Sequence, residues 1–284
     1  MKENKKPVIG IIGFGMVGRA VQHGFAQLCD FRIYDIETTS SENTFEETIR
    51  ESDFIFICVP TPANYETGEC DTSILEETIE KSRKYMTPKK IIIIKSTIPP
   101  GTTKNIQEKV PHLRIVFNPE FLTARTSKLD FINTSRIVIG GNPDDLCEVE
   151  GLYRLKFKHT QIYWTDTTTA EMVKYAANCF FSTKVSLFNE YFEICRKLNV
   201  DFDEMMKMLI ADGRIGNSHT DVPGHDGEFG FGGLCFPKDI QALIYTAKKL
   251  GVDPKVLEAA WKKNLEVRKK RDWEKIVGAV SNKA

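Results

Sequence analysis

The sequence has no excess charge of either sign, no long apolar run and no closely spaced pair of cysteines. Its 284 residues include 39 lysines and arginines and 39 aspartates and glutamates, so the formal net charge is zero. A balanced charge gives no reason to expect binding to nucleic acid or to an anionic membrane surface. The longest apolar runs, such as residues 91–94, are far too short to span a bilayer. We therefore expect no nucleic-acid partner and no membrane partner.

The cysteines and the first residues of the chain point to a reducing compartment. The seven cysteines are odd in number and widely scattered, and none forms a Cys-x-x-Cys pair, which argues against a disulfide framework. The first residues are polar and charged, unlike a secretory signal. His219, His225 and Cys235 do not have the spacing of a common zinc site. We expect a cytoplasmic protein without a bound metal.

Short apolar strands alternate with helical stretches in the first half of the chain. Near-continuous isoleucine and valine runs are typical of strands buried on both faces, as in parallel sheets. Alternation of strands and helices favours right-handed βαβ units and a doubly wound, mostly parallel sheet. Strands are expected at residues 8–12, 31–34, 54–59, 91–95, 114–117, 136–139 and 161–164. Helices are expected over 15–28, after a capping box at Thr44 and Glu47, and after Ser73 and Glu76.

The pattern changes near residue 165, where helices begin to dominate. Thr168 and Glu171 are spaced as a capping box and open a helical stretch that continues to about residue 198. Further helices are expected over 201–210, 237–250 and 254–277. The sequence therefore predicts a sheet domain over 1–165 and an all-helical domain over 166–284. A long glycine-rich loop lies between residues 211 and 234, and loops of this length in compact domains are usually functional or disordered.

A glycine motif follows the first predicted strand and opens a helix. Gly13 suits a tight turn, Gly15 lets a pyrophosphate approach the backbone, and Gly18 permits close packing of helix on sheet. Asp35 ends the second strand, where it can accept hydrogen bonds from a ribose and would repel a 2′-phosphate. The Rossmann-like pattern therefore predicts NAD, bound by residues that include Phe14, Met16 and Val17. The alternative is a glycine turn with no ligand.

Cys235 lies in the segment Gly-Phe-Gly-Gly-Leu-Cys-Phe-Pro-Lys-Asp, residues 230–239. Pro237 suits the first turn of a helix, so Cys235 would lie just before a helix N-terminus with Lys238 nearby. Both features stabilise a thiolate. Asp239 could face the same site. The pattern indicates a nucleophilic thiol, and the alternative is a buried structural cysteine.

Other polar residues could complete a reaction centre. Lys174 and Asn178 are four residues apart on the long helix, so they share one face and either line a polar site or lie at its edge. Glu120 follows a strand, at the end where such sheets bind ligands, and is a candidate base or a salt-bridged surface acid. Thr97 ends another strand and could bind cofactor or water, or satisfy the turn.

Together these segments resemble the UDP-glucose and GDP-mannose dehydrogenase family. The matching pieces occur in order and span nearly the whole chain: Gly13-x-Gly15-x-x-Gly18, Val59-Pro60-Thr61-Pro62, Ser96-Thr97-x-Pro99-x-Gly101, Asn118-Pro119-Glu120-Phe121-Leu122, Glu171-x-x-Lys174-x-x-x-Asn178, Asn189-Glu190 and the segment 230–239 that holds Cys235. The Asn118–Leu122 piece looks more like the UDP-glucose branch of the family.

The resemblance implies a four-electron oxidation of a sugar alcohol to a carboxylate, with two NAD reduced. It implies that Asp239 helps deprotonate the alcohol, that Lys174 and Asn178 stabilise oxygen charge, and that Cys235 forms a thiohemiacetal and then a thioester. Glu120 and Thr97 would help water to hydrolyse that thioester. The resemblance also assigns the remaining contacts: Pro60, Thr61 and Thr97 to NAD, and Glu120, Phe121, Leu122, Thr123, Lys174, Asn178, Arg214, Phe231 and Gly232 to the nucleotide sugar. It further implies a homodimer formed through the long helix.

The sequence departs from the family pattern in two places. Family members usually carry a second glutamate where Ala124 stands, and they have a third nucleotide-fold domain that would begin where this sequence ends. The chain is then a compact short form, a fragment, or a subunit completed by another chain. Three functions stay open: a UDP-glucose 6-dehydrogenase, a dehydrogenase for another nucleotide sugar or a smaller hydroxyacid, and a nucleotide-sugar-binding protein that has lost turnover.

Overall fold

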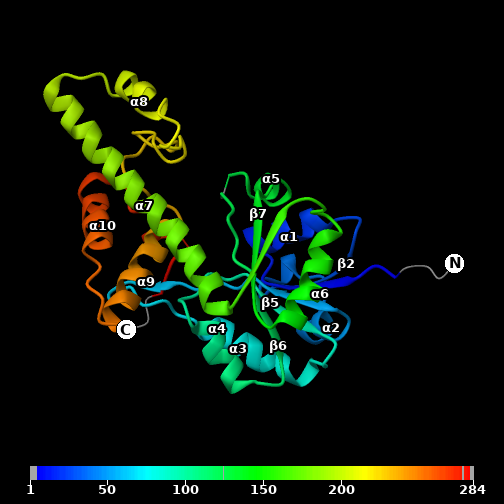
Figure 1. Ribbon diagram of the computed structural model, residues 1–284. Helices are drawn as coiled ribbons and strands as arrows, with labels where there is room; N and C mark the ends of the chain where they lie inside the picture. Colours follow the sequence, from blue (N-terminus) through cyan, green and yellow to red (C-terminus); the bar gives the residue numbers. More distant parts are fainter. Residues whose placement is uncertain (1–4, 124, 277, 282–284) are drawn as a thin grey trace. The chain divides into compact units, whose positions relative to one another are not determined.

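The computed structural model describes residues 5–123, 125–276 and 278–281 (Figure 1). The chain divides into two compact units. Unit 1 comprises Met1–Thr61 and Thr72–Lys174, and unit 2 comprises Pro62–Asp71 and Tyr175–Ala284. The division falls inside the long helix, nine residues beyond the predicted boundary at 165, and a short segment from the first half of the chain belongs to unit 2.

Unit 1 is built on a seven-stranded sheet, as expected. Its strand order is β2-β1-β3-β5-β6-β7-β8. The strands are β1 (Val8–Ile12), β2 (Asp30–Tyr34), β3 (Phe54–Ile57), β5 (Ile91–Ile94), β6 (Arg114–Phe117), β7 (Arg136–Gly140) and β8 (Gln161–Thr165). All neighbours are parallel except β6 and β7, which pair antiparallel through Phe117 and Gly140. The doubly wound, mostly parallel fold is confirmed, and the antiparallel pair is a feature that the strand pattern alone does not show.

Helices cover both faces of this sheet (Figure 1). They are α1 (Met16–Phe25), α2 (Phe45–Arg50), α3 (Ser73–Ser82), α4 (Thr102–Lys109), α5 (Ser127–Ile132), α6 (Pro143–Arg154) and the beginning of α7 (Thr167–Leu198), with short 3-10 turns at Thr38–Ser40 and Arg83–Tyr85. In β5, Ile91 and Ile93 pack with Phe25 of α1, while Ile92 and Ile94 pack with Leu75 of α3. Alternate side chains of one strand thus fill two cores, which explains the uninterrupted isoleucine run.

Unit 2 is mostly helical. It holds the rest of α7, α8 (Phe202–Ile210), α9 (Phe236–Lys249), α10 (Lys255–Val267) and a 3-10 turn at Asp272–Glu274. The expectation of an all-helical domain is incomplete, because β4 (Ala63–Asn64) and β9 (Val280–Ser281) form a small parallel sheet in this unit. Two-residue strands are too short to give a sequence signal.

The predicted helix over 254–277 is too long. The backbone leaves helical geometry at Arg268, whose φ is −86° and ψ is 111°. Its guanidinium is buried and binds Asp226 and Asp272, at 2.8 Å and 3.2 Å. A buried cation needs such partners, so the chain turns at Arg268 to supply them.

Two of the three predicted caps also differ from the structure. Thr44 and Glu47 form the expected capping box at α2. At α3, however, Ser73 is already helical, and the Thr72 hydroxyl donates to Glu76. At α7, the Asp166 carboxylate accepts a hydrogen bond from the Thr169 amide. The Glu171 carboxylate does not cap α7 but accepts the amides of Gly101 and Thr103. In the described residues no helix combines the length and the apolar character that crossing a membrane requires.

Candidate active site

The glycine motif connects β1 to α1 as the sequence predicts. Gly13 has a φ of +90°, and a Cβ there would lie 2.7 Å from the Cys58 carbonyl oxygen. A Cβ on Gly18 would lie 2.4 Å from the Gly13 carbonyl oxygen. These two glycines are therefore required by packing. By contrast, a Cβ on Gly15 would meet nothing within 4 Å, so the open side of the loop is at the second glycine.

Asp35 lies beside this loop. Its carboxylate accepts the Phe14 amide at 2.5 Å and the Glu37 amide at 2.9 Å. The helix α1 begins at Met16, and its N-cap Gly15 has no side chain to occupy the first amides. Open space, helix N-terminal donors and an adjacent carboxylate together fit the pyrophosphate and ribose of NAD. Val17 lies in this same first turn.

Thr61 and Thr97, two further residues predicted to bind NAD, are brought together. The Thr61 hydroxyl donates to the Thr97 carbonyl at 2.6 Å, and Pro60 next to it is exposed. The loop after Thr97 is held by Glu171 of α7. The Glu171 carboxylate accepts the amides of Gly101 and Thr103, at 2.5 Å and 2.8 Å, at the start of α4.

Glu171 is buried in unit 1, with its carboxylate on the backbone at the start of α4. Burial raises its pKa to about 7, against the opposing effect of hydrogen bonds from Thr103 and Gly101. The motif that contains Glu171 was visible in the sequence, but its partner, the loop before α4, was not. The sequence had assigned Glu171 to a capping box, and the structure instead places its carboxylate on this loop.

Glu120 and Lys174 form a buried ion pair. The Lys174 ammonium lies 2.7 Å from Glu120 Oε1, and the side chains are only 5% and 3% exposed for Glu120 and Lys174. The second carboxylate oxygen accepts the Leu122 amide at 2.7 Å. Burial disfavours the ionised carboxylate, but Lys174, the Leu122 amide and Lys95 outweigh burial and lower the pKa of Glu120. Glu120 is thus a buried acid in a salt bridge. Of the alternative, a helix-capping or salt-bridged surface acid, the surface placement is wrong.

The residues after Glu120 are also fixed locally. The ring of Phe121 has the Arg136 guanidinium 4.2 Å and the Lys174 ammonium 5.8 Å from its centroid. The Thr123 amide donates to Asp130. Ala124, where the family's usual glutamate is missing, lies outside the described residues.

In unit 2, Cys235 is the N-cap of α9, which confirms the predicted helix start. Pro237 occupies the first turn, and the Cys235 side chain makes no capping hydrogen bond. Cys235 is half-buried, and none of the seven cysteines is in a disulfide. A thiol at a helix N-terminus is in a position that favours the thiolate.

Asp239 lies at the centre of a buried polar cluster beside this helix start. Its carboxylate accepts from the Lys238 ammonium and from the Asn178 amide, each at 2.5 Å. Burial disfavours the Lys238 cation, but the charge of Asp239, followed by Cys70 and Cys235, outweighs burial and raises the pKa of Lys238. The structure thus brings Lys238 and Asp239 together in the first turn of α9, and their part in the chemistry of the Cys235 thiol stays a prediction.

The glycines before Cys235 are held by side chains of unit 2. The Asn264 side chain binds both the amide and the carbonyl of Phe231, at 2.7 Å and 3.0 Å. A Cβ on Gly232 would lie 2.3 Å from the Arg268 guanidinium and 2.4 Å from the Asp272 carboxylate. The space that requires glycine at 232 is therefore filled by the protein itself. Arg214 is highly exposed and pairs with Asp212.

The fold and the glycine loop define a dinucleotide-binding protein of the dehydrogenase type. Two models of one family match the chain: the UDP-glucose/GDP-mannose dehydrogenase family, NAD binding domain, over residues 34–156, and the same family's central domain over residues 168–266. The chain belongs to this family. NAD is accordingly the cofactor of unit 1.

Curated relatives of the chain are named UDP-glucose 6-dehydrogenases. The chain is 35% identical to the UDP-glucose 6-dehydrogenase of Rickettsia bellii over 228 residues, which are 78% of this chain and 51% of that protein. It is 33% identical to UDP-glucose 6-dehydrogenase TuaD of Bacillus subtilis over 252 residues, 86% of this chain and 53% of that protein. The chain spans about half the length of these relatives.

Solved structures agree on the fold. The UDP-glucose dehydrogenase of Pyrobaculum islandicum superimposes with a TM-score of 0.81 at 25% identity, covering 94% of this chain and 69% of that one. A UDP-D-ManNAc dehydrogenase of Pyrococcus horikoshii gives a TM-score of 0.80 at 26% identity, covering 92% and 68%.

Proposed function

We propose that this protein catalyses the NAD-dependent, four-electron oxidation of the C6 alcohol of a nucleotide sugar, converting UDP-glucose to UDP-glucuronate. The observation that carries the proposal is the half-buried thiol of Cys235 at the start of α9, next to the buried Lys238 and Asp239. The curated relatives named as UDP-glucose 6-dehydrogenases support the choice of sugar.

The protein's residues would act in sequence. Asp239, alone or through water, would take the proton of the sugar alcohol as the alcohol becomes an aldehyde. The Cys235 thiolate would then form a C–S bond to the aldehyde carbon, and the carbonyl oxygen would take a proton to give a thiohemiacetal. Asn178 donates one amide hydrogen to Asp239 and has a second one for the developing oxygen charge, a role that Lys174 would share.

The second half of the reaction needs water and a base. Loss of a second hydride, together with loss of the hydroxyl proton to water, would convert the thiohemiacetal into a thioester. Glu120, assisted by Thr97, would then accept one proton from a water molecule as the water oxygen adds to the thioester carbonyl. The C–S bond would break to release the thiolate and the carboxylic acid, which would lose its proton to water to give the carboxylate. Bound NAD supplies the hydride acceptor for each of the two oxidations.

Substrate contacts follow from the same assignment. The residues that we assign to binding the nucleotide sugar are Glu120, Phe121, Leu122, Thr123, Lys174, Asn178, Arg214, Phe231 and Gly232. We assign cofactor binding to residues 1–165, and substrate binding and dimerisation to residues 166–284. For Gly232 only the backbone is available, because Arg268 and Asp272 fill the space beside its Cα.

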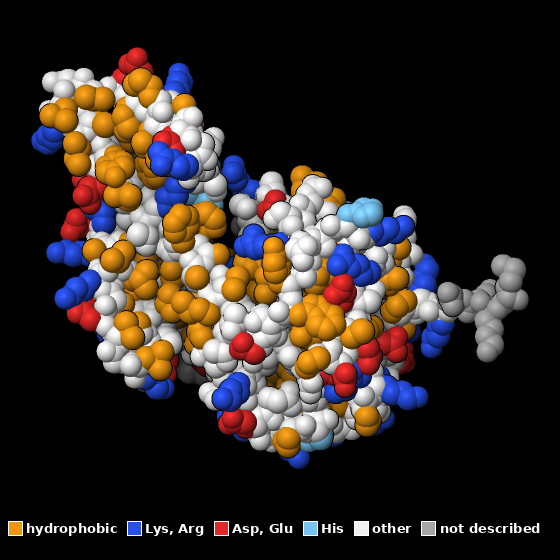
Figure 2. Space-filling view, viewed as in Figure 1, with side chains coloured by type: hydrophobic (Ala, Val, Ile, Leu, Met, Phe, Trp, Pro, Cys, Tyr) orange, Lys and Arg blue, Asp and Glu red, His pale blue; other side chains and the backbone are white. Residues whose placement is uncertain are grey.

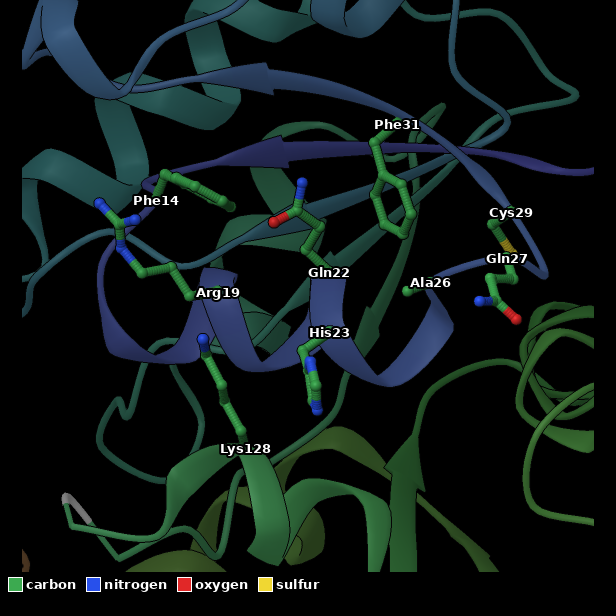
Figure 3. Close-up of a pocket in the computed structure, with 9 residues that line it drawn as sticks. All are labelled: Phe14, Arg19, Gln22, His23, Ala26, Gln27, Cys29, Phe31 and Lys128. Atoms are coloured by element: carbon green, nitrogen blue, oxygen red, sulfur yellow. The ribbon is translucent and has the colours of Figure 1, made fainter.

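We further propose a homodimer formed through α7 in the cytoplasm. Large apolar side chains are exposed along the unit 2 part of α7 at Phe180, Leu187, Tyr191, Ile194 and Leu198. Figure 2 shows apolar side chains gathered over the region where α7 runs in Figure 1. A surface of this kind on one helix is typical of a protein interface. Seven cysteines, none of them in a disulfide, suit a reducing compartment.

The test is to mix the full chain with NAD and UDP-glucose and to follow the absorbance of the reduced cofactor. We expect two reduced cofactors per sugar and a sugar acid as product. UDP-N-acetylhexosamines and GDP-mannose are run in parallel, because the structural relative from Pyrococcus is named for UDP-D-ManNAc. One reduced cofactor per sugar would point to a simple alcohol dehydrogenase. If the nucleotide sugar raises the melting temperature but no NAD is reduced, the chain is a binding protein. Recovery of NAD reduction in Ala124→Glu would then show that the missing glutamate is the cause.

A further inference from the structure

A second buried lysine, Lys95, lies beside the Glu120 region and has no part in the chemistry proposed above. Lys95 follows β5 directly and is 4% exposed. Its ammonium donates to Asn118 Oδ1 at 2.9 Å and to the Pro119 carbonyl at 3.4 Å. These two residues immediately precede Glu120. Lys95 therefore holds the turn that carries the proposed base.

Asn118 connects this lysine to the rest of the sheet. The same oxygen, Oδ1, also accepts from the Tyr153 hydroxyl of α6, and Asn118 Nδ2 donates to the Val138 carbonyl of β7 at 2.7 Å. Asn118 is 2% exposed, so these bonds are not in competition with water. Two side chains, Lys95 and Tyr153, and one backbone carbonyl of β7 thus converge on the residue two positions before Glu120.

Lys95 and Glu120 also line one small cavity of about 30 Å³, which is room for one or two waters. Glu120 is the sole carboxylate among its described lining residues, while Lys95 and Arg136 are its cations. Lys95 and Glu120 are 4% and 6% exposed, so the effect of one charge on the other is screened much less than at the surface.

The electrostatics agree with this geometry. Burial lowers the pKa of Lys95 to about 8; the charges of Cys58 and Glu120 oppose that effect, and the charge of Lys174 adds to it. In return, the charge of Lys95 contributes to lowering the pKa of Glu120. Cys58, Glu120 and Lys174 are therefore the titratable groups that act on Lys95.

We propose that Lys95 is a positioning residue that holds Glu120 in place and keeps it ionised for the attack of water on the thioester. The inference rests on the proposed function, since it concerns the same base. Lys95 acts through the Asn118–Pro119 turn and through its charge. It need not touch the substrate.

The kinetic test measures the pH dependence of sugar-acid formation for Lys95→Met and two controls. Removing a cation near a buried carboxylate raises the carboxylate's pKa by about one unit or more. We therefore expect the acid limb of the profile to move up by about one pH unit in Lys95→Met. On that limb the rate falls several-fold, and the Cys235 acyl-enzyme accumulates as a mass shift in quenched samples.

The controls separate charge from loss of contacts. Tyr153→Phe removes a hydrogen bond to the same Asn118 oxygen without changing charge, and Lys90→Met removes a part-buried lysine whose ammonium donates to the Arg50 and Ser52 carbonyls. Both should leave the acid limb in place. An acid limb that stays in place in Lys95→Met, or that moves equally in Tyr153→Phe, would overturn the proposal.

A second measurement does not depend on activity. Urea unfolding of Lys95→Met is compared in the parent and in a Glu120→Gln background. If Lys95 acts on the charge of Glu120, its removal lowers the unfolding midpoint less when residue 120 is neutral. Equal losses in the two backgrounds would refute the interaction. If the parent protein reduces no NAD with any nucleotide sugar, the proposed function fails, while this cycle still decides the role of Lys95.

Discussion

Each unit of the molecule buries one carboxylate against a lysine, but the two pairs are assembled in different ways. In unit 1, Glu120 and Lys174 are 54 residues apart in sequence and meet because a strand end and α7 pack together. In unit 2, Lys238 and Asp239 are neighbours in the first turn of α9, and Asn178 of α7 completes the cluster. One pair depends on tertiary structure, and the other depends mainly on where a helix begins.

The comparison shows which residues are placed for chemistry. Burying two charges is expensive, and a buried ion pair often stabilises a fold no better than apolar side chains of similar size. Two such pairs, one in the unit that carries the predicted cofactor-binding loop and one at the start of a helix that Cys235 caps, are therefore better explained by function than by stability.

The largest expected effect concerns the thiol, which only unit 2 supplies. Cys235→Ser should reduce sugar-acid formation by more than about a thousandfold, because a serine hydroxyl is not ionised at neutral pH. NAD binding and the unfolding midpoint should stay unchanged. Cys147→Ser, which alters an exposed cysteine of unit 1, is the matched control. Sugar acid formed by Cys235→Ser at the parent rate would rule out covalent catalysis.

The second prediction breaks the long-range pair. Lys174→Met leaves Glu120 buried with its main partner missing, which should lower the free energy of unfolding by about 3–5 kcal/mol. The double variant Lys174→Met/Glu120→Gln should recover most of that loss, because no charge is then left unpaired. Urea unfolding measures both. Lys238→Met is the corresponding change in unit 2, where Asn178 still donates to Asp239, just as the Leu122 amide still donates to Glu120 in Lys174→Met, so a loss in the same range is expected. A loss below about 1 kcal/mol for either variant would show that the pair contributes no more than an exposed ion pair does.

The third prediction uses Glu171, whose pKa rises from 4.5 to about 7 on folding. A raised carboxyl pKa means that folding favours the protonated form. The associated stability is complete below about pH 4.5 and is lost as the pH rises towards 7, by about 3 kcal/mol in all. Glu171→Gln should flatten this part of the curve of unfolding free energy against pH. Glu77→Gln, on the exposed face of α3, should leave the curve unchanged. A Glu171→Gln curve as steep as the parent's would show that other groups cause the dependence.

Local sequence signals predicted that Lys238 and Asp239 lie together, but they did not predict the contact of Glu120 with Lys174. Cys235, Lys238 and Asp239 lie within five residues, and Pro237 marks the helix start, so their proximity follows from helix geometry. The contact of Glu120 with Lys174 depends on how strand ends and α7 pack, which no short window of sequence contains. Lys95 was absent from the predicted site because it ends an apolar strand and its partners follow the next one.

In the fold, too, features set by local sequence were predicted and features set by contacts between distant residues were not. The seven strands of the large sheet were found because continuous isoleucine and valine runs mark strands buried on both faces. The antiparallel pairing of β6 with β7, the pair β4–β9 and the end of α10 at Val267 were not found. Each depends on a contact between distant residues, such as that of Arg268 with Asp226.

The smallest expected effect concerns dimer formation, for which an exposed apolar residue of unit 2 is compared with one of unit 1. Ile194 of α7 and Leu129 of α5 are 49% and 56% exposed, so exposure alone does not distinguish them. If α7 forms the proposed dimer, Ile194→Glu should weaken association by about 2 kcal/mol, roughly a 30-fold rise in the dissociation constant. Leu129→Glu should leave it unchanged. Light scattering across a dilution series measures both. Because a charge at an exposed site alters folding little, equal unfolding midpoints for the two variants would assign the difference to the interface, whereas an unchanged dissociation constant for Ile194→Glu would remove α7 from it.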